Sequence, residues 1–517
     1  LPAELLTSIF EIAVEDMSIY NLELPTCMAL SSWEDRRDEW VLVDPMESMY
    51  IQQRDKYRVT KGIIFTCRHW YQLAYHLLFH TIFIQDPSRL PSLCLALDRH
   101  ESLGWHVRRL HLVRYYPPRG LTLAHVAAML ATVIHQCPNL SLCLVEWSLV
   151  NTFPNIASAL STYSARSLRA LHINITQETL PRLIWALDSL PQLVSATIEF
   201  SSSPSPPSIA SSSSSPLSSL PENEASELPD TTPHLGAASQ LSLTLPCLRQ
   251  LSLRGNSQTF IEEAIGWALP ALRAFSLDFM AGRHNLPDVS GFLSAHGSAL
   301  AFLDLNTVPA LDVSAVLSLC PLLTAFCFNP DWRMPFHNPP DPDDPQTALP
   351  SFIDTPHPNI RFIGLHQLMH AFLPKAQPPA NDFVDMATIL VQRTNDLTFQ
   401  QLNKMNFPQL QIVRVLNRVL LKNLERNDGP EEGEGLARWE RWYDQCVNQG
   451  VRLEDCTGAL LGTLPSDEEE GSEEEFEYVG VEEEREPVMK PDNVGELREL
   501  LEDIKRMKVE EPAPAFP

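Results

Sequence analysis

A short apolar template recurs along this chain of 517 residues and constrains its fold more than any other feature. The template is L-x-x-L-x-L with conservative apolar replacements, and its clearest copy runs from Leu248 to Leu253. The last two apolar positions of each copy alternate, so they fall on one face of a short strand. The copies end at Leu110/Leu112, Cys143/Val145, Leu171/Ile173, Ala196/Ile198, Leu251/Leu253, Phe275/Leu277, Leu303/Leu305, Phe326/Phe328, Ile363/Leu365 and Val413/Val415.

The spacing of these copies indicates one strand and one helix per unit. Several copies follow one another at 23 to 28 residues. Between them, residues 125–137 place Val126, Leu130, Val133 and Ile134 on one helical stripe. A single unit of this kind cannot bury its apolar face, so the units are expected to stack. Chance recurrence in a Leu-rich chain is the alternative, but ten copies make it the weaker explanation.

The pattern resembles the leucine-rich repeat family. That resemblance implies an α/β solenoid formed by residues 85–200 and 241–420, whose exposed strand positions bind a protein substrate. The Asn that the family places three residues after the last Leu is present at Asn256 and absent from most other copies, so irregular repeats are expected. Candidate substrate-binding residues are Arg249, Gln250, Ser252, Arg273, Ser276, Arg361 and Arg414.

Two segments have compositions typical of disorder. Residues 201–219 contain twelve Ser and four Pro, which bury too little apolar surface to offset the entropy of ordering. This predicts a disordered Ser/Pro-rich insertion over 201–240. Residues 467–486 carry twelve acidic residues and one Arg, which predicts a solvated acidic tail over 465–491. Residues 421–464 are expected to close the array, and 492–509 form a short helix that is either a partner-binding element or a docked tail.

The N-terminal residues carry a second pattern. The chain opens LPAELLTSIF, which predicts a helix with Leu5, Leu6, Ile9 and Phe10 on a wide apolar stripe. A second helix is predicted over residues 63–74 (IIFTCRHWYQLA), and the apolar run LLFHTIFI follows it.

These segments, LPxELLxxIF, then F-x-x-C-R-x-W-x-x-L-A, then L-F-x-x-I, resemble the F-box family. The resemblance implies a small all-α module over residues 1–84, split by an insertion at 14–58, that docks onto a Skp-type adaptor of a cullin–RING ubiquitin ligase. The alternative is that both helices only cap the solenoid, in a scaffold protein whose degenerate F-box joins no ligase. The resemblance makes the following residues adaptor-binding: Leu1, Pro2, Leu5, Leu6, Ile9, Phe10, Cys67, Trp70, Leu73 and Phe79.

Composition argues against several other classes. A net charge of −27 disfavours nucleic acid and anionic membrane surfaces, and no apolar run has transmembrane length. Ten Cys without a CxxC pair suggest reduced thiols in the cytoplasm or nucleus. The sequence contains no phosphate loop, nucleophile elbow or H-E-x-x-H motif. We therefore expect a receptor without catalytic residues, cofactor or metal.

The predicted fold class is α/β, with a small all-α F-box module followed by an irregular leucine-rich-repeat-like solenoid, a disordered Ser-rich insertion and an acidic tail. The predicted function is that of a substrate receptor in a Skp–cullin–F-box ubiquitin ligase.

Overall fold

The computed structural model describes residues 1–14, 24–35, 40–113, 122–148, 152–201, 235–279, 287–306, 312–331, 353–372, 386–425, 430 and 433–460. Leu1–Leu464 form one compact unit. Most of the predicted Ser/Pro-rich insertion, the acidic tail and the helix over 492–509 lie outside the described residues. None of the helices within the described ranges is long and apolar enough to cross a membrane.

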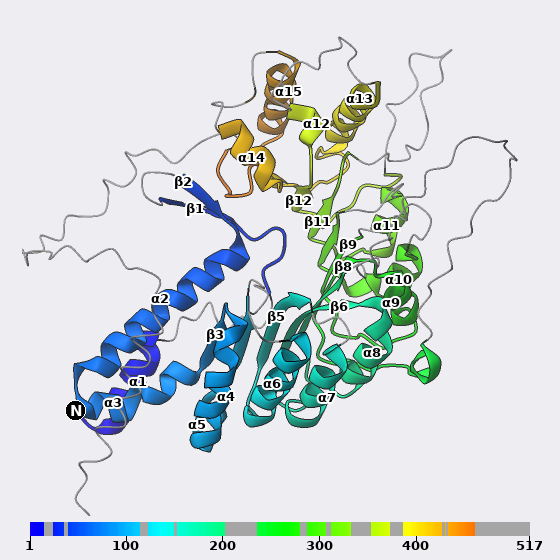
Figure 1. Ribbon diagram of the computed structural model, residues 1–517. Coiled ribbons are helices and arrows are strands. Elements are labelled where there is room, and N and C mark those ends of the chain that lie inside the picture. The colour runs from blue at the N-terminus through cyan, green and yellow to red at the C-terminus, as the bar shows by residue number, and fades with distance from the viewer. Residues whose placement is uncertain are drawn as a thin grey trace, which may run out of the picture. The chain divides into compact units, whose positions relative to one another are not determined.

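Twelve strands form one parallel sheet whose spatial order follows the chain (Figure 1). The described strand pairs keep a continuous register, with one shift between Val145 and Ser148 of β5. The strands are β3 (Thr81–Ile84), β4 (Arg109–Leu112), β5 (Leu142–Ser148), β6 (Ala170–Thr176), β7 (Ser195–Ser201), β8 (Gln250–Gly255), β9 (Ala274–Asp278), β10 (Phe302–Leu305), β11 (Ala325–Phe328), β12 (Phe362–Leu365), β13 (Ile412–Val415) and β14 (Arg452–Glu454).

All ten strands predicted from the template are present, as β4 to β13. Their paired apolar residues, such as Leu251 and Leu253 of β8, point into one continuous buried core. The prediction succeeded because alternation places both residues on the same side of the sheet. β3 and β14 extend this sheet beyond the predicted strands, one at each end.

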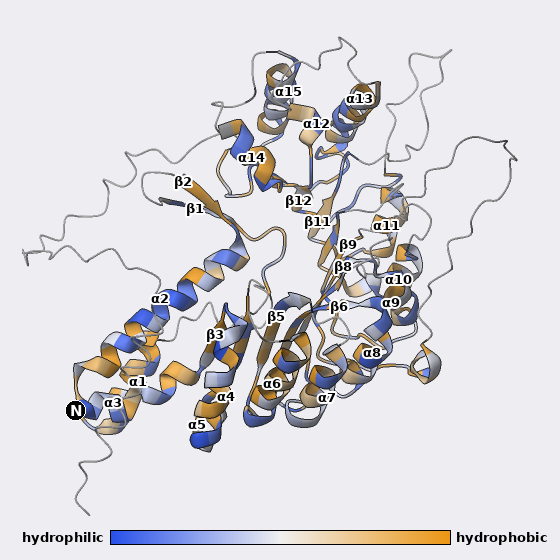
Figure 2. Ribbon diagram, viewed as in Figure 1, coloured by the Kyte–Doolittle hydropathy of each residue, from blue (hydrophilic) through white to orange (hydrophobic). Residues whose placement is uncertain are grey.

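Helices between the strands supply the other half of this core. In Figure 2, hydrophobic and hydrophilic stretches alternate along α6 to α8, as expected for helices with one buried side. These helices are α4 (Leu90–Arg99), α5 (Glu101–His106), α6 (Leu123–Gln136), α7 (Phe153–Tyr163), α8 (Leu180–Asp188), α9 (Gln258–Ala264), α10 (Val289–His296), α11 (Val313–Leu319), α12 (Met369–Phe372), α13 (Met386–Gln401), α14 (Arg418–Glu425) and α15 (Glu434–Asn448), with 3-10 turns at η3 (Pro87–Arg89), η5 (Gln177–Thr179), η6 (Gly236–Gln240) and η7 (Gly297–Ala299).

The N-terminal region contains helices and a hairpin. Its elements are α1 (Ala3–Val14), the antiparallel strands β1 (Ser32–Asp35) and β2 (Trp40–Val43), α2 (Pro45–Thr66), α3 (Arg68–Ala74) and η2 (Tyr75–Phe79). Asp44 caps α2 by accepting from the backbone N–H groups of Met46 and Glu47.

The prediction of a single helix over residues 63–74 is wrong, because the helix is interrupted at Cys67. The backbone of Cys67 is extended, and its thiol accepts a hydrogen bond from the backbone N–H of Trp70. Cys67 thus ends α2 and begins α3.

The predicted fold class also needs correction, although its α/β class matches. The N-terminal region is not all-α, because β1 and β2 form a hairpin and β3 is the first strand of the main sheet. The sheet also continues across the predicted Ser-rich insertion, since β7 pairs directly with β8. One twelve-stranded parallel sheet with helices replaces the predicted all-α module followed by an irregular leucine-rich-repeat solenoid.

Candidate functional site

The helices α1, α2, α3 and η2, here called the N-terminal helical unit, share a core of their own. Phe10, Ile64, Ala74 and Leu77 are buried in it. The ring of Phe10 packs on that of Trp70, with 4.8 Å between centroids. One side of α1 is therefore fixed against α2 and α3.

The other side of α1 presents apolar side chains to solvent. Leu5, Ile9 and Ile12 of α1 are 53%, 48% and 73% exposed, and Leu1, two residues before the helix begins, is 84% exposed. Their spacing of three to four residues puts them along one side of a helix. This set is called the apolar row, and exposed apolar side chains grouped in this way are typical of interaction sites.

The predicted adaptor-binding residues divide by burial. Leu1, Pro2, Leu5, Ile9 and Cys67 are exposed, Leu6, Trp70, Leu73 and Phe79 are half-buried, and Phe10 is buried. Phe79 packs against the main core rather than the core of the helical unit. The first group can contact a partner directly, whereas Phe10 and Trp70 hold α1 in place.

A second candidate site lies on the sheet face opposite the buried pairs. The x position between the last two apolar residues of each template falls there. One ladder of paired residues crosses all twelve strands. This central row consists of Phe83, His111, Leu144, His172, Thr197, Ser252, Ser276, Asp304, Cys327, Gly364, Arg414 and Glu454. Most of its members are polar, unlike the buried pairs beside them.

Residues 24–31, here called the crossing segment, run along the central row. The carbonyl of Leu24 accepts from Gln250 Nε2 at 2.8 Å, and that of Met28 accepts from Arg414 Nη1 at 2.7 Å. Ser31 bonds through its backbone N–H to the carbonyl of Cys456. The segment therefore reaches from β8 to the residues after β14.

A cavity of about 120 Å³ remains between the crossing segment and the sheet. Its lining is mixed in charge and polarity. It includes Cys27, His172, Arg254, Asp278, Asp304 and His366.

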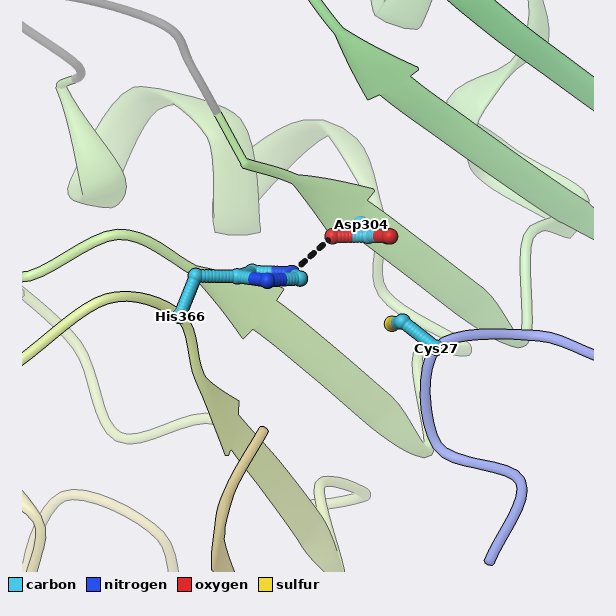
Figure 3. A group of neighbouring side chains, drawn as sticks. All are labelled: Cys27, Asp304 and His366. Carbon is cyan, nitrogen blue, oxygen red and sulfur yellow. Dashed lines mark hydrogen bonds and ion pairs between the residues drawn. The ribbon is translucent and has the colours of Figure 1, made fainter. Parts of the chain in front are cut away.

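Cys27, Asp304 and His366 meet at this cavity, as Figure 3 shows. The Nε2 atom of His366 lies 2.7 Å from Oδ1 of Asp304. Burial alone would lower the pKa of His366, but the carboxylate of Asp304 and its hydrogen bond raise that pKa to about 10. Without another ligand, the two side chains thus form a buried ion pair.

The predicted substrate-binding residues occupy two places. Ser252, Ser276 and Arg414 belong to the central row, and the first two line the cavity. Gln250 is buried and bonded to the crossing segment. Arg249, Arg273 and Arg361 are exposed one residue before β8, β9 and β12.

The sequence did not predict the crossing segment, or that Gln250 and Arg414 bind it rather than a substrate. Asp304 and His366 belong to no sequence motif, and Cys27 lies in the insertion at 14–58, to which no site was assigned. The x position between the last two apolar residues of the template was the available signal. It is polar in most copies, which marks a polar row on one face of the sheet.

Comparison with models of known protein families finds no match to this chain. A search of curated proteins likewise finds no matching sequence.

Proposed function

We propose that this chain is the substrate receptor of a Skp–cullin–F-box ubiquitin ligase. The N-terminal helical unit binds the Skp-type adaptor, and the sheet binds a protein substrate. The apolar row on α1 carries this proposal, because its residues include three of those that the F-box resemblance makes adaptor-binding: Leu1, Leu5 and Ile9.

Docking explains the apolar row better than capping does. A helix that only caps a sheet buries its apolar stripe against that sheet. In α1 the side bearing Phe10 is covered by the helical unit, and the side bearing Leu5 and Ile9 is open. Phe65 of α2 and Tyr71 of α3 are exposed as well, so neighbouring helices offer further apolar area.

The substrate side of the proposal rests on the polar central row and the strand starts beside it. Crossing-segment contacts already occupy Gln250 and Arg414. Ser252 and Ser276 at the cavity and the exposed Arg249 and Arg361 are not bonded to the crossing segment. Arg273 is exposed too, but its Nη1 donates to the carbonyl of Ala299. The receptor itself needs no catalytic group, since holding a substrate near the ubiquitin-loaded enzyme raises its effective concentration.

The compartment proposed is the cytoplasm or nucleus. All ten cysteines are free thiols, several of them buried in the core. Free thiols in this number are typical of a reducing compartment.

The test is binding of the full chain to a purified Skp-type adaptor, measured by biolayer interferometry. Leu5→Asp and Ile9→Asp should each weaken binding at least about 10-fold, because each removes buried apolar area and adds a charge. Leu95→Asp on α4 is the matched control, since Leu95 is 56% exposed and lies outside the helical unit. It should bind like the wild type.

Circular dichroism and thermal unfolding establish that each variant folds. Wild-type protein that fails to bind the adaptor would refute the proposal and favour a scaffold with a degenerate F-box. Equal binding by wild type and both α1 variants would also refute the assignment of the docking surface.

A further inference from the structure

Three side chains with metal-ligand chemistry converge from separate parts of the chain. Cys27 comes from the crossing segment, Asp304 from β10 and His366 from the residue after β12. Their ligand atoms all lie within 4.8 Å of one another. No sequence motif joins these residues, so the fold itself creates the cluster.

The cluster is sheltered from water. Asp304 is 7% exposed, and the side chains of Asp304 and His366 are 10% and 13% exposed. Burying a carboxylate is costly unless a cation or several hydrogen bonds compensate it. The imidazole of His366 compensates part of the cost of burying the Asp304 carboxylate. This pair does not explain why the thiol of Cys27 lies beside both groups.

The approach of that thiol depends on a residue without a side chain. Gly364 pairs with Cys327 across β11 and β12. A Cβ at Gly364 would lie 2.6 Å from Cys327 Sγ and 2.9 Å from Met28 Sδ. The absence of a side chain at Gly364 therefore provides the space that residues 27 and 28 need to approach the sheet.

We propose that Cys27, Asp304 and His366 bind a divalent d-block cation, with Zn²⁺ the best match to this donor set. Sulfur, imidazole nitrogen and carboxylate oxygen are the atoms that Zn²⁺ takes in proteins, whereas Ca²⁺ and Mg²⁺ take oxygen. Zinc bonds of about 2.0–2.3 Å place tetrahedral ligands roughly 3–4 Å apart. The existing separations require only small side-chain movements to reach that spacing.

The cluster supplies three protein ligands, and Cys327 is not one of them, because it does not belong to the group whose ligand atoms all lie within 4.8 Å of one another. Cys327 is buried and belongs to the central row between Asp304 and Gly364. Three protein ligands leave the fourth tetrahedral position of Zn²⁺ to water or to another ligand.

The bound ion would fasten the crossing segment at its middle. Hydrogen bonds from Gln250 to Leu24 and from Arg414 to Met28 hold the segment on either side of Cys27. Metal bonds at Cys27 would add a tie to β10 and to the end of β12. The crossing segment is followed by the β1–β2 hairpin and then by α2. A zinc ion that holds the segment would therefore also restrict the movement of the chain leading into α2. This site does not depend on the proposed ligase function.

The test uses the full chain, stripped by chelator dialysis and then titrated with Zn²⁺ in a calorimeter. We expect a site of one equivalent and a rise in the thermal unfolding midpoint when it fills. Cys27→Ser and His366→Gln should each weaken that site at least about 10-fold. Cys247→Ser is the control, since Cys247 is a half-buried thiol that lies outside the cluster.

Co²⁺ substitution distinguishes this site from weak binding by the acidic residues of 467–486. Cobalt bound to a thiolate gives a charge-transfer absorption in the near ultraviolet, which carboxylates alone do not give. Wild-type protein should show this band, and Cys27→Ser should weaken it. The absence of a thiolate band in the wild type, or a band and an affinity unchanged in both Cys27→Ser and His366→Gln, would overturn the proposal.

Discussion

Gly364 is closely surrounded by the side chains of three other residues. An added Cβ would approach Cys327 Sγ, Leu416 Cδ1 and Met28 Sδ at 2.6, 2.8 and 2.9 Å. Gly364→Ala should therefore lower the free energy of unfolding by about 1–3 kcal/mol, the usual cost of overpacking a filled site. Urea denaturation of the full chain measures this change.

Gly62 provides the matched control for that substitution. It lies exposed within α2, and a Cβ there meets nothing within 4 Å. Gly62→Ala should raise stability by about 0.5–1 kcal/mol, because alanine favours a helix over glycine. If Gly364→Ala behaved like Gly62→Ala, the close approach of the crossing segment to β12 would be contradicted.

His111 predicts a pH dependence of stability. It is buried beside Tyr50 and Phe83. Among the described residues, neither ring nitrogen has a hydrogen-bond partner. Burial, with a smaller contribution from the charge of Arg109, lowers the pKa of His111 to about 3. Below the unfolded pKa of about 6.5, the unfolded chain binds a proton that the folded chain does not, so stability falls as pH falls.

His111→Phe should remove this effect. Between pH 7.5 and pH 5, the stability of the variant relative to wild type should improve by about 2 kcal/mol. His172, whose pKa burial lowers to about 4, remains in both proteins and does not affect the comparison. Denaturant unfolding at both pH values measures the difference, and identical pH dependence would contradict the assigned burial of His111.

The strands were the most predictable elements. Pairs such as Leu251/Leu253 and Ile363/Leu365 alternate apolar residues within a repeated template, and this local pattern fixes both strand and buried face. β3 was missed because Thr81–Ile84 follows helical residues and was included in the F-box resemblance. The start of α2 could have been predicted, because Asp44 followed by Pro45 is a typical helix N-terminus.

The crossing segment could not have been predicted by such local patterns. Leu24 and Gln250, or Met28 and Arg414, are far apart in the sequence, and only the assembled sheet brings them together. The same reason hides the cluster of Cys27, Asp304 and His366. Sequence patterns thus locate the central row but not the segment that lies on it.

Arg414 links the crossing segment to the last two strands. Its Nη2 lies 2.7 Å from Glu454 Oε2, and its Nη1 donates to the carbonyl of Met28. Both side chains are largely buried. Among the described residues, Arg414→Leu leaves the carboxylate of Glu454 with Arg452 as its ion-pair partner, at 3.1 Å. We expect a loss of about 3 kcal/mol in unfolding free energy.

The double variant Arg414→Leu/Glu454→Leu supplies the control for Arg414→Leu. It removes both charges and should recover much of the lost stability. Chemical denaturation compares the proteins. A double variant no more stable than Arg414→Leu would show that the Glu454 carboxylate left without Arg414 does not cause the loss of stability.

The two candidate sites of the described residues differ in polarity and in place. The apolar row on α1 belongs to a helical unit with its own core, whereas the central row belongs to the sheet. A receptor that joins an adaptor to a substrate needs two such separate surfaces. We propose that the apolar row docks a Skp-type adaptor.

Hydrogen–deuterium exchange of the full chain, with and without the purified adaptor, tests that claim most directly. We expect slower exchange on adaptor binding in α1 and in α3, with the sheet strands β6 to β12 unchanged. Slower exchange confined to the sheet, or no change anywhere at saturating adaptor, would contradict it.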